Sequence, residues 1–384
     1  MRLAVSQDFL RRMPEASQDL RRKYSLWRRL HIDVPLLLLL LATGAVGLIM
    51  LYSASDENFR YLQRQIVFFV LAFAVMWVVA QVDIYALARW SWLFYLGAVV
   101  LLMLVPFFGV GAKGAQRWLS LPGFRFQPSE IMKFALPIMV AAYLSKRHLP
   151  PRFKHILWSL VIIAIPAVLI FQQPDFGTSI LIALSGLSVL FLAGIAWRYI
   201  IGSGVLILAA AWPMWQFVLH DHMKARIITF LSPESDKWGA GWNIMQSKTA
   251  IGSGGFWGKG WMQGTQSHLD FLPESHTDFI IAVLAEEHGL IGVTALIALY
   301  LAVVLRGAMI AMSAQDTFGR LLAGSITFTF VFYIFVNMGM ASGILPVVGA
   351  PLPLISYGGT SLVTLMMGFG LLMAISTQDR KITV

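Results

Sequence analysis

Apolar runs of about 20 residues recur from one end of this chain to the other, and they restrict its fold more than any other feature. An α-helix of about that length crosses the hydrocarbon core of a bilayer. Hydrophobic residues make up 58% of the chain and charged residues only 12%, about half the charged share of soluble domains. Lipid offers no partner to an open backbone, so the runs predict helices rather than exposed strands. We therefore expect an all-α, polytopic membrane protein.

The apolar runs predict about ten transmembrane helices. The predicted spans are 34–53, 65–82, 91–108, 128–145, 156–172, 178–196, 199–219, 278–305, 319–340 and 360–376. They form one predicted domain, 34–376, between a basic tail (1–33) and a short C-terminal tail (377–384). The first run is long and follows a long basic tail, which favours a membrane helix over a cleavable signal peptide. The tail itself is either poorly ordered or a helix lying on anionic lipid.

Lysine and arginine predict the orientation of these helices. Eight of them lie in the N-terminal tail and four more lie between residues 146 and 155. Such basic segments stay in the cytoplasm, so both termini are predicted to be cytoplasmic. The connections 109–127, 172–177, 220–277 and 341–359 are then exterior. The net charge of +10 is explained by topology and lipid contact, and nucleic acid is not an expected partner.

Two of the exterior connections are predicted to be structured. The connection 220–277 is rich in aromatic residues, which is unusual for a disordered loop, and we expect it to fold onto the membrane face. The run GILPVVGAPLPLISYGGTS (343–361) holds prolines and glycines that prevent a regular helix. Irregular backbone at membrane depth is tolerated only inside protein or beside a wet cavity. We therefore predict a re-entrant segment that forms one wall of a site.

One acid stands at the mouth of the eighth predicted span. Asp278 follows the polar run FLPESHT and precedes the apolar run FIIAVLA. A carboxylate at the mouth of a membrane helix is costly to keep, so it is by default a functional-site hypothesis. Glu286 and Glu287 lie about 12 Å further along the same helix. We expect those two acids to be buried rather than to act beside Asp278.

Other polar residues are predicted to face the same side. Lys113, Arg117 and Arg125 lie in an exterior loop without an acid, which indicates an anionic ligand or lipid phosphates. Glu130 and Lys133 share a helix face at i, i+3 and can pair, either for packing or for a role in the site.

Asp175 belongs to the run QQPDFGTS, in which Pro174 suits a first helical turn. The acid then lies near the positive end of the helix dipole. It is either a cap or a second acid beside the site.

Several kinds of site are excluded or disfavoured. The chain has no cysteine, which excludes disulfides, thiolate nucleophiles and Cys-based metal centres. The glycines near Lys259 allow close backbone approach to a ligand but lack the ending of a Walker motif, so nucleotide binding is not expected. The exterior histidines do not show the ligand spacing of a structural zinc site; they are His220, His222, His268 and His276.

Several long motifs in order closely resemble the SEDS family (shape, elongation, division and sporulation). They are AKGAQRW, FQPSEIMK, QPDFGTS, QSKTAIGSGG with GKG, FLPESHTDFI with AVLAEE, and LPVVGAPLPLISYGGTS. The similarity runs from about residue 33 to the C-terminus. The runs VVGAPLPL and GKGWMQGTQSHLDFLPE are similar to the elongation branch of the family rather than to its division branch. The departures, HTDFII for the more usual HTDFIF and a longer basic tail, do not involve the proposed chemistry.

The resemblance implies a peptidoglycan glycosyltransferase in the bacterial cytoplasmic (inner) membrane. Such proteins polymerise lipid II, an undecaprenyl-pyrophosphate-linked disaccharide pentapeptide, on the exterior face. The implied partners are a class B penicillin-binding protein, which crosslinks the strands, and the elongation proteins MreB, MreC, MreD and RodZ. Grooves between apolar helices are candidates to hold the polyprenyl tails.

This chemistry gives the polar residues expected roles. Asp278 is the expected general base. The expected pyrophosphate-binding cations are Lys113, Arg117, Lys133 and Arg226. The expected supporting polar network is Glu130, Asp175, Gln246, Ser247, His276 and Ser356. A divalent cation, Mg²⁺ or Mn²⁺, would also stabilise the leaving group, with Asp175 and Glu130 as candidate ligands.

Two other classes of function are weighed against the enzyme. A lipid II flippase or another transporter would also have many spans and intramembrane acids. A transporter needs polar residues near the bilayer midplane, whereas those of this chain gather at the exterior ends of the helices. A scaffold that only recruits a partner would have no need of Asp278 together with the exterior cations. The pattern therefore favours chemistry at the exterior surface.

Overall fold

The computed structural model describes residue 27 and residues 30–378, except 113–114, 122–123, 219–223, 225–227, 230–231, 233–235, 237–238, 269–270 and 273. Within this part each predicted span falls on a helix. These helices are α3 (Val34–Ala54), α4 (Phe59–Ala80), α5 (Ile84–Phe108), α6 (Pro128–Ser145), α7 (Phe153–Gln172), α8 (Phe176–Leu192), α9 (Trp197–Pro213), α13 (Ile280–Ser313), α14 (Thr317–Ala341) and α15 (Gly359–Thr377). Among the described residues, seven helices are long and apolar enough to cross a membrane, so the fold is that of a multi-pass membrane protein. The count of ten crossings stays a prediction.

Short polar residues begin several of these helices. Their side chains accept hydrogen bonds from backbone N–H groups of the first turn, which have no partner within the helix. The caps are Asp33 on α3, Asn58 on α4, Asp83 on α5, Asp175 on α8 and Asp316 on α14. Local sequence thus sets where these helices start.

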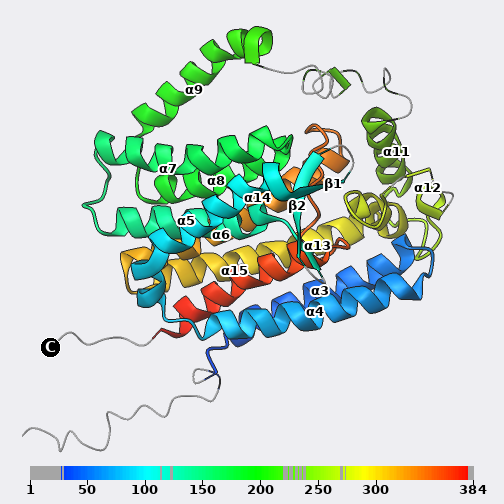
Figure 1. Ribbon diagram of the computed structural model, residues 1–384. Coiled ribbons are helices and arrows are strands. Elements are labelled where there is room, and N and C mark those ends of the chain that lie inside the picture. The colour runs from blue at the N-terminus through cyan, green and yellow to red at the C-terminus, as the bar shows by residue number, and fades with distance from the viewer. Residues whose placement is uncertain are drawn as a thin grey trace, which may run out of the picture.

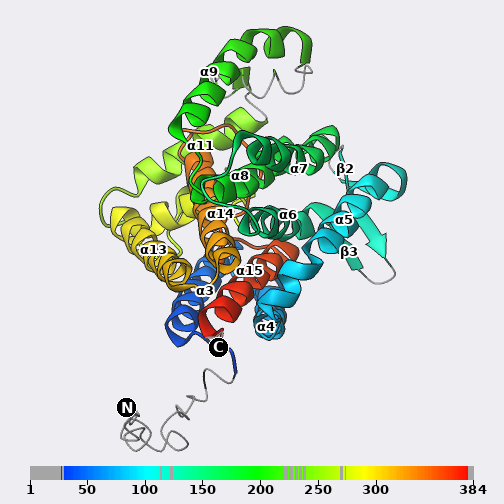
Figure 2. The ribbon, with the colours of Figure 1, turned by 90° about the vertical axis from the view of Figure 1, so that its left-hand side faces the viewer.

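Helix α14 lies at the centre of the bundle. It contacts α6, α8, α13 and α15, as the end-on view shows (Figure 2). In the apolar 18-residue stretch of α14, 61% of the residues are buried. The corresponding share is 22% for α13 and for α4, whose outer faces remain exposed. Helix α9 lies apart from the bundle and exposes most of its apolar side chains (Figure 1). The central position of α14 means that its polar side chains can reach several other elements.

The connection 109–127, predicted as a loop, contains a small sheet. Strands β1 (Gly109–Ala112), β2 (Ala115–Leu121) and β3 (Phe124–Phe126) pair antiparallel in the order β1-β2-β3. The register pairs Gly109 with Leu119 and Leu119 with Phe126. The sheet contacts α5 and α6 and stands at one end of the bundle (Figure 1). Such short strands are weakly marked in sequence, and the three-stranded sheet is stabilised here by packing on the helices.

Helix α13 is longer than the predicted span 278–305 and is broken at Gly289. Gly289 has φ +63°, a backbone conformation that favours glycine. Residues 255–260 of the connection between α9 and α13 pair with the backbone on both sides of the break. The same connection contains α11 (Ala240–Ser253) and the short α12 (Thr265–His268), while η1 (Met214–Val218) extends α9 as a π-helix. The prediction that this connection is structured is confirmed for its described residues.

Residues 345–358, the re-entrant segment, run between α14 and α15 without forming a helix. Its Ala350, Leu352, Leu354 and Ile355 are buried. The hydroxyl of Tyr300 donates to the carbonyl of Pro353 at 2.6 Å. Leu290 is the first residue beyond the break in α13. Tyr300 lies ten residues after it, or about 15 Å further along the helix axis. The segment therefore enters the bundle to the depth of the apolar helices, as the sequence predicted.

Candidate functional site

The main-chain carbonyl groups of three consecutive residues, 276–278, fix the position of Asp278 at the mouth of α13. The carbonyl of His276 accepts from Tyr357 N at 3.0 Å, and that of Asp278 accepts from Asn337 Nδ2 at 2.8 Å. Between them, the carbonyl of Thr277 accepts from Ser356 Oγ. We call residues 276–278 and these three donors the carbonyl clamp. Buried carbonyls need partners, so the clamp fixes the backbone that carries Asp278.

Asn337 is the clamp residue that sequence reasoning missed. It is fully buried in α14, and its second amide hydrogen goes to the carbonyl of Ala350 at 2.7 Å. A β-carbon added at Gly349 would lie 3.5 Å from Asp278 Oδ2, so the carboxylate faces the re-entrant segment. The available signal was an amide inside an apolar span, where a polar group is costly without partners.

His276 and Ser356, both predicted members of the polar network, lie at this clamp. Ser356 Oγ also accepts from Leu352 N at 2.8 Å. The His276 ring packs against Tyr61 and Tyr357, at centroid distances of 5.1 and 6.2 Å. Burial lowers the pKa of His276, and the carboxylate of Glu274 opposes this by raising it. These contacts favour a neutral imidazole that supports the loop.

A second polar group lies deeper, on α6. Lys133 Nζ donates to Glu130 Oε1 at 2.6 Å, which confirms the predicted i, i+3 pair. The other oxygen of Glu130 accepts from Thr364 Oγ1 on α15 at 2.5 Å. Lys133 also lies 4.9 Å from the centre of the Tyr333 ring. A cavity of about 30 Å³, room for one or two water molecules, is lined by Lys133, Tyr333 and Thr364.

A third polar group joins β2 to the start of α8. Arg117 Nη1 lies 3.7 Å from Asp175 Oδ2, and Gln127 Nε2 donates to the same oxygen at 3.1 Å. Asp175 also caps α8, accepting from Thr178 N at 3.3 Å. The prediction that Pro174 lies in the first helical turn is wrong, because Asp175 is already the cap and the helix begins after it. Both proposed roles of Asp175 are therefore compatible with the geometry.

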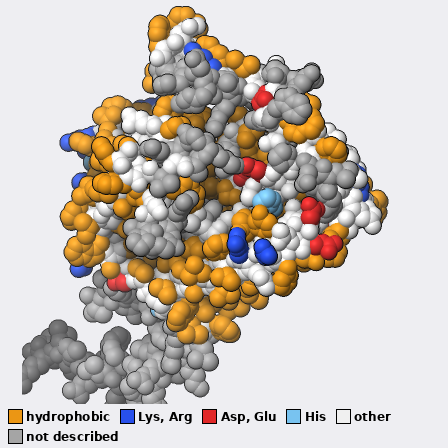
Figure 3. Space-filling model, turned by 45° about the vertical axis from the view of Figure 1, so that its right-hand side comes forward, with side chains coloured by type: hydrophobic (Ala, Val, Ile, Leu, Met, Phe, Trp, Pro, Cys, Tyr) orange, Lys and Arg blue, Asp and Glu red, His pale blue; other side chains and the backbone are white. Residues whose placement is uncertain are grey.

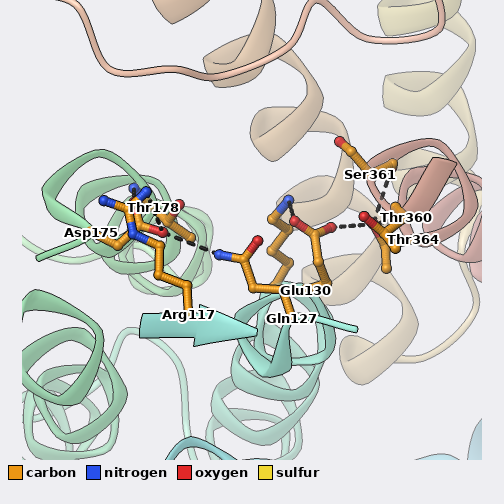
Figure 4. Close-up of polar contacts among 9 residues, drawn as sticks. Arg117, Gln127, Glu130, Asp175, Thr178, Thr360, Ser361 and Thr364 are labelled. Atoms are coloured by element: carbon orange, nitrogen blue, oxygen red, sulfur yellow. Dashed lines mark hydrogen bonds and ion pairs between the residues drawn. The ribbon is translucent and has the colours of Figure 1, made fainter. Parts of the chain in front are cut away.

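These groups converge around the re-entrant segment. Tyr333, beside Lys133, and Asn337, beside Asp278, are one turn apart on α14, about 6 Å along its axis. Figure 4 shows the polar residues running from Asp175 and Arg117 through Gln127 to Glu130 and Thr364. On the molecular surface, acidic, basic and histidine side chains gather around a hollow at this end of the bundle (Figure 3). Asp278 and Lys133, from distant parts of the chain, are thus attached to neighbouring turns of α14.

Other predicted site residues lie elsewhere or outside the described residues. Ser247, on α11, donates to the carbonyl of Ala341 at 2.7 Å and joins α11 to the end of α14. Gln246 is half-buried on the same helix. Lys113 and Arg226 lie outside the described residues, as do His220 and His222, and the side chain of Arg125 is not described.

Asp175 and Glu130 are the predicted metal ligands. Among the described residues, no three His, Asp or Glu side chains come together as a metal site. The oxygens of Glu130 are bonded by Lys133 and Thr364, and those of Asp175 by Gln127 and Thr178. These residues do not fit a protein-held metal centre. The divalent cation itself, Mg²⁺ or Mn²⁺, stays a prediction.

An apolar groove runs along the outside of the bundle between α13 and α14. It has a volume of about 610 Å³ and begins near Ile281, three residues after Asp278. Ile297, Leu301 and Phe335 line it with exposed apolar side chains. The groove therefore opens toward the surroundings of the helices, where lipid or another membrane helix would lie.

Comparisons with known proteins agree with this architecture. Residues 34–381 match the FtsW/RodA/SpoVE family, described as cell cycle proteins. The chain is 49% identical to the peptidoglycan glycosyltransferase MrdB of Escherichia coli K12, over 94% of this chain and 98% of that protein. It is 39% identical to a probable peptidoglycan glycosyltransferase FtsW of Geobacter sulfurreducens, over 90% and 95%.

Solved structures are similar over the same length. A chain of a peptidoglycan synthase complex that coordinates polymerization and crosslinking has a TM-score of 0.80 and 28% identity, covering 90% of this chain and 97% of that one. The crystal structure of Thermus thermophilus RodA has a TM-score of 0.68 and 26% identity, covering 90% and 98%. The chain belongs to the SEDS family of FtsW, RodA and SpoVE, and within it stands with RodA.

Proposed function

We propose that this protein is a peptidoglycan glycosyltransferase that polymerises lipid II during cell elongation. The observation that carries the proposal is the carbonyl clamp, which fixes the backbone of Asp278 against Asn337, one turn of α14 from Tyr333, whose ring centre lies 4.9 Å from Lys133. An acid and a cation attached to neighbouring turns of one helix suit a reaction that removes a proton and releases a pyrophosphate. The relatives named as peptidoglycan glycosyltransferases support the same reaction.

In the proposed reaction, the carboxylate of Asp278 takes the proton from the C4 hydroxyl of the acceptor GlcNAc. That oxygen attacks the anomeric carbon of the donor MurNAc. The bond from this carbon to the pyrophosphate oxygen breaks, and the configuration is inverted. The new glycosidic bond joins the two sugars, and undecaprenyl pyrophosphate leaves with the electron pair.

Cations stabilise the charge that develops on the leaving group. Lys133 and Arg117 are the described candidates, and Glu130 and Asp175 orient them through the ion pairs at 2.6 and 3.7 Å. Lys113 and Arg226 are further proposed contacts. Because Lys133 is held by Glu130 before substrate binds, little reorganisation is needed when the charge appears.

A crosslinking partner is proposed to bind along the membrane-facing side. A glycan strand that leaves this site must be crosslinked by a second enzyme, which we propose is a class B penicillin-binding protein of the MreB, MreC, MreD and RodZ complex. The groove between α13 and α14 is wide and apolar and would accept the membrane helix of such a partner. A polyprenyl chain is the competing occupant. Chemical crosslinks formed from position 301 to the partner test which of the two occupies the groove. Loss of these crosslinks when lipid II is the only addition would favour the polyprenyl chain.

The proposed location is the bacterial cytoplasmic membrane, with both termini in the cytoplasm. The basic residues between α6 and α7 support this orientation, since such segments stay inside. The clamp and the sheet then lie on the exterior face, where lipid II is consumed. Accessibility of single introduced cysteines to a membrane-impermeant reagent tests the orientation, because the chain has no cysteine of its own.

Polymerisation of lipid II by the purified protein tests the proposal, with and without the transpeptidase. Asp278→Asn keeps the shape of the side chain but cannot accept the proton, so the rate should fall at least ~100-fold. Near-normal polymer from this variant would refute the role of Asp278. Lipid II scrambling by the wild type without polymer under either condition would favour the flippase.

A further inference from the structure

The connection between α9 and α13 completes the broken helix. A break at Gly289 would leave backbone groups on both sides without their helical partners. Residues 255–260 supply these partners in four backbone hydrogen bonds. They are Lys259 N to Glu286 O at 3.0 Å, Gly260 N to Glu287 O at 3.0 Å, Leu290 N to Gly255 O at 3.0 Å and Ile291 N to Phe256 O at 3.3 Å. The position of this segment relative to α13 is therefore fixed.

A buried acid holds the same segment from its other side. Glu286 is fully buried, and its Oε1 accepts from Lys259 Nζ at 2.6 Å and from Gln266 N at 3.1 Å. Thr265 Oγ1 donates to the same oxygen at 3.1 Å. These contacts lie on both sides of residues 260–264 in sequence, so the intervening chain cannot move away from α13. This accounts for the burial of Glu286, which the proposed reaction does not use.

The fixed segment nevertheless exposes large aromatic side chains. Trp257 is 79% exposed, Phe256 57% and Trp261 50%. The rings of Phe256 and Trp257 are 5.5 Å apart, and Trp261 lies 6.4 Å from Tyr52 at the end of α3. We call these three residues the aromatic anchor. Their side chains stand out from backbone that is held in place by the helix.

The position of the anchor along α13 matches a membrane boundary. Beyond the break, Leu290, Ile297, Leu301 and Leu305 expose apolar side chains on one helical stripe. The stripe continues past Arg306, which pairs with Asp33 at 2.6 Å, to the exposed Met312. Leu290 and Met312 are about 33 Å apart along the axis. The hydrocarbon core is about 30 Å thick, so the stripe is long enough to span it and the anchor lies near one edge.

We propose that Phe256, Trp257 and Trp261 insert into the interfacial layer of the bilayer and hold the 240–268 connection on the membrane surface. Tryptophan is enriched at this depth because its ring is apolar and its N–H is polar. The exposed apolar side chains of Leu290 and Ile291 adjoin the anchor, since Ile291 bonds to Phe256, and neither residue lines the groove proposed for the partner. The occupant we assign to the anchor is therefore lipid rather than protein.

Single cysteines test this proposal cleanly, because the chain contains none. Trp257→Cys, Leu290→Cys and Thr249→Cys would each carry the same environment-sensitive fluorophore in lipid nanodiscs, without the transpeptidase. Thr249 is exposed on α11 in the same connection and controls for the hydrophobicity of the fluorophore. The label at 257 should be quenched several-fold more by lipid-attached nitroxides than the label at 249. Its quenching should resemble that of the label at 290, and aqueous iodide should quench it only weakly.

Two results would overturn the proposal. A label at 257 that iodide quenches as strongly as the label at 249 would place the anchor in water. Iodide protection that arises only after the transpeptidase is added would make this surface a protein interface. Neither result depends on polymerisation, so the anchor and the proposed reaction are tested separately.

Discussion

Asn337 donates one amide hydrogen to the main-chain oxygen of Asp278 at 2.8 Å and the other to that of Ala350 at 2.7 Å. The loop that carries the proposed base and the re-entrant segment therefore share one fully buried side chain. A base must lie within hydrogen-bond reach of the proton that it abstracts. Asn337 fixes the backbone of Asp278 relative to that of Ala350. Its role can therefore be tested by mutation in the same way as that of Asp278.

Asn337→Leu should lower polymerisation strongly because it removes the amide that donates to the carbonyls of Asp278 and Ala350. Two buried carbonyls lose their partners, at a cost of about 1–3 kcal/mol of stability each. The matched control is Tyr300→Phe, which removes one buried hydrogen bond to Pro353 in the same segment but leaves Asp278 untouched. Rates per folded protein and thermal unfolding would be measured for both. Equal loss of rate in the two variants would reduce Asn337 to a structural residue.

A double-mutant cycle separates the two roles of the Glu130–Lys133 pair. Lys133→Met should destabilise the protein by about 3–5 kcal/mol, because it leaves a buried carboxylate unpaired. Adding Glu130→Gln removes that charge and should restore most of the stability. If Lys133 binds the pyrophosphate, the double variant stays inactive although it is folded. Recovered polymerisation in the double variant would show that the pair serves packing alone.

Asp175→Asn distinguishes the cap of α8 from the charge beside Arg117. Asparagine caps a helix about as well as aspartate, so the bond from Thr178 N and the unfolding temperature should be kept. The ion pair with Arg117 is lost. We expect a lower polymerisation rate with little change in stability, whereas Asp175→Ala should also cost about 0.5–2 kcal/mol of stability. Unchanged rates in Asp175→Asn would leave Asp175 as a cap only.

Gly289→Ala should destabilise the protein through the break in α13. The residue has a positive φ, and an added β-carbon would overlap Gly258 N and the carbonyl of Phe256. The strain at φ costs about 1–3 kcal/mol, to which the overlap adds. Gly252→Ala in α11 is the control, since a β-carbon there meets nothing within 4 Å. The thermal unfolding temperature should fall for Gly289→Ala and should stay the same or rise for Gly252→Ala.

His276 should make stability decrease on the acid side. Burial lowers its pKa, so the folded state resists protonation more than the unfolded chain does. Its contribution is fully present above the unfolded pKa of about 6.5 and is lost as the pH falls through the lower pKa of the folded state. Denaturant unfolding from neutral to acid pH measures this. The variant His276→Gln should show a smaller decrease, and an identical profile would contradict the assignment.

The sequence by itself determined the membrane class, most helices and several of their caps. These depend on composition and on neighbours within a few residues, such as the acid that begins α8 or the i, i+3 spacing of Glu130 and Lys133. It also singled out Asp278 and the re-entrant segment, because polar or irregular backbone is costly at membrane depth.

Only the tertiary structure decided which groups meet. Asn337 and Asp278 are 59 residues apart, and Ser356 and Thr277 are 79 apart, so no local pattern links them. The break at Gly289 and the exposed Trp257 likewise depend on contacts between distant segments. Sequence periodicity reports which face of a helix is apolar, but the partner of a buried polar group is set by how the helices pack.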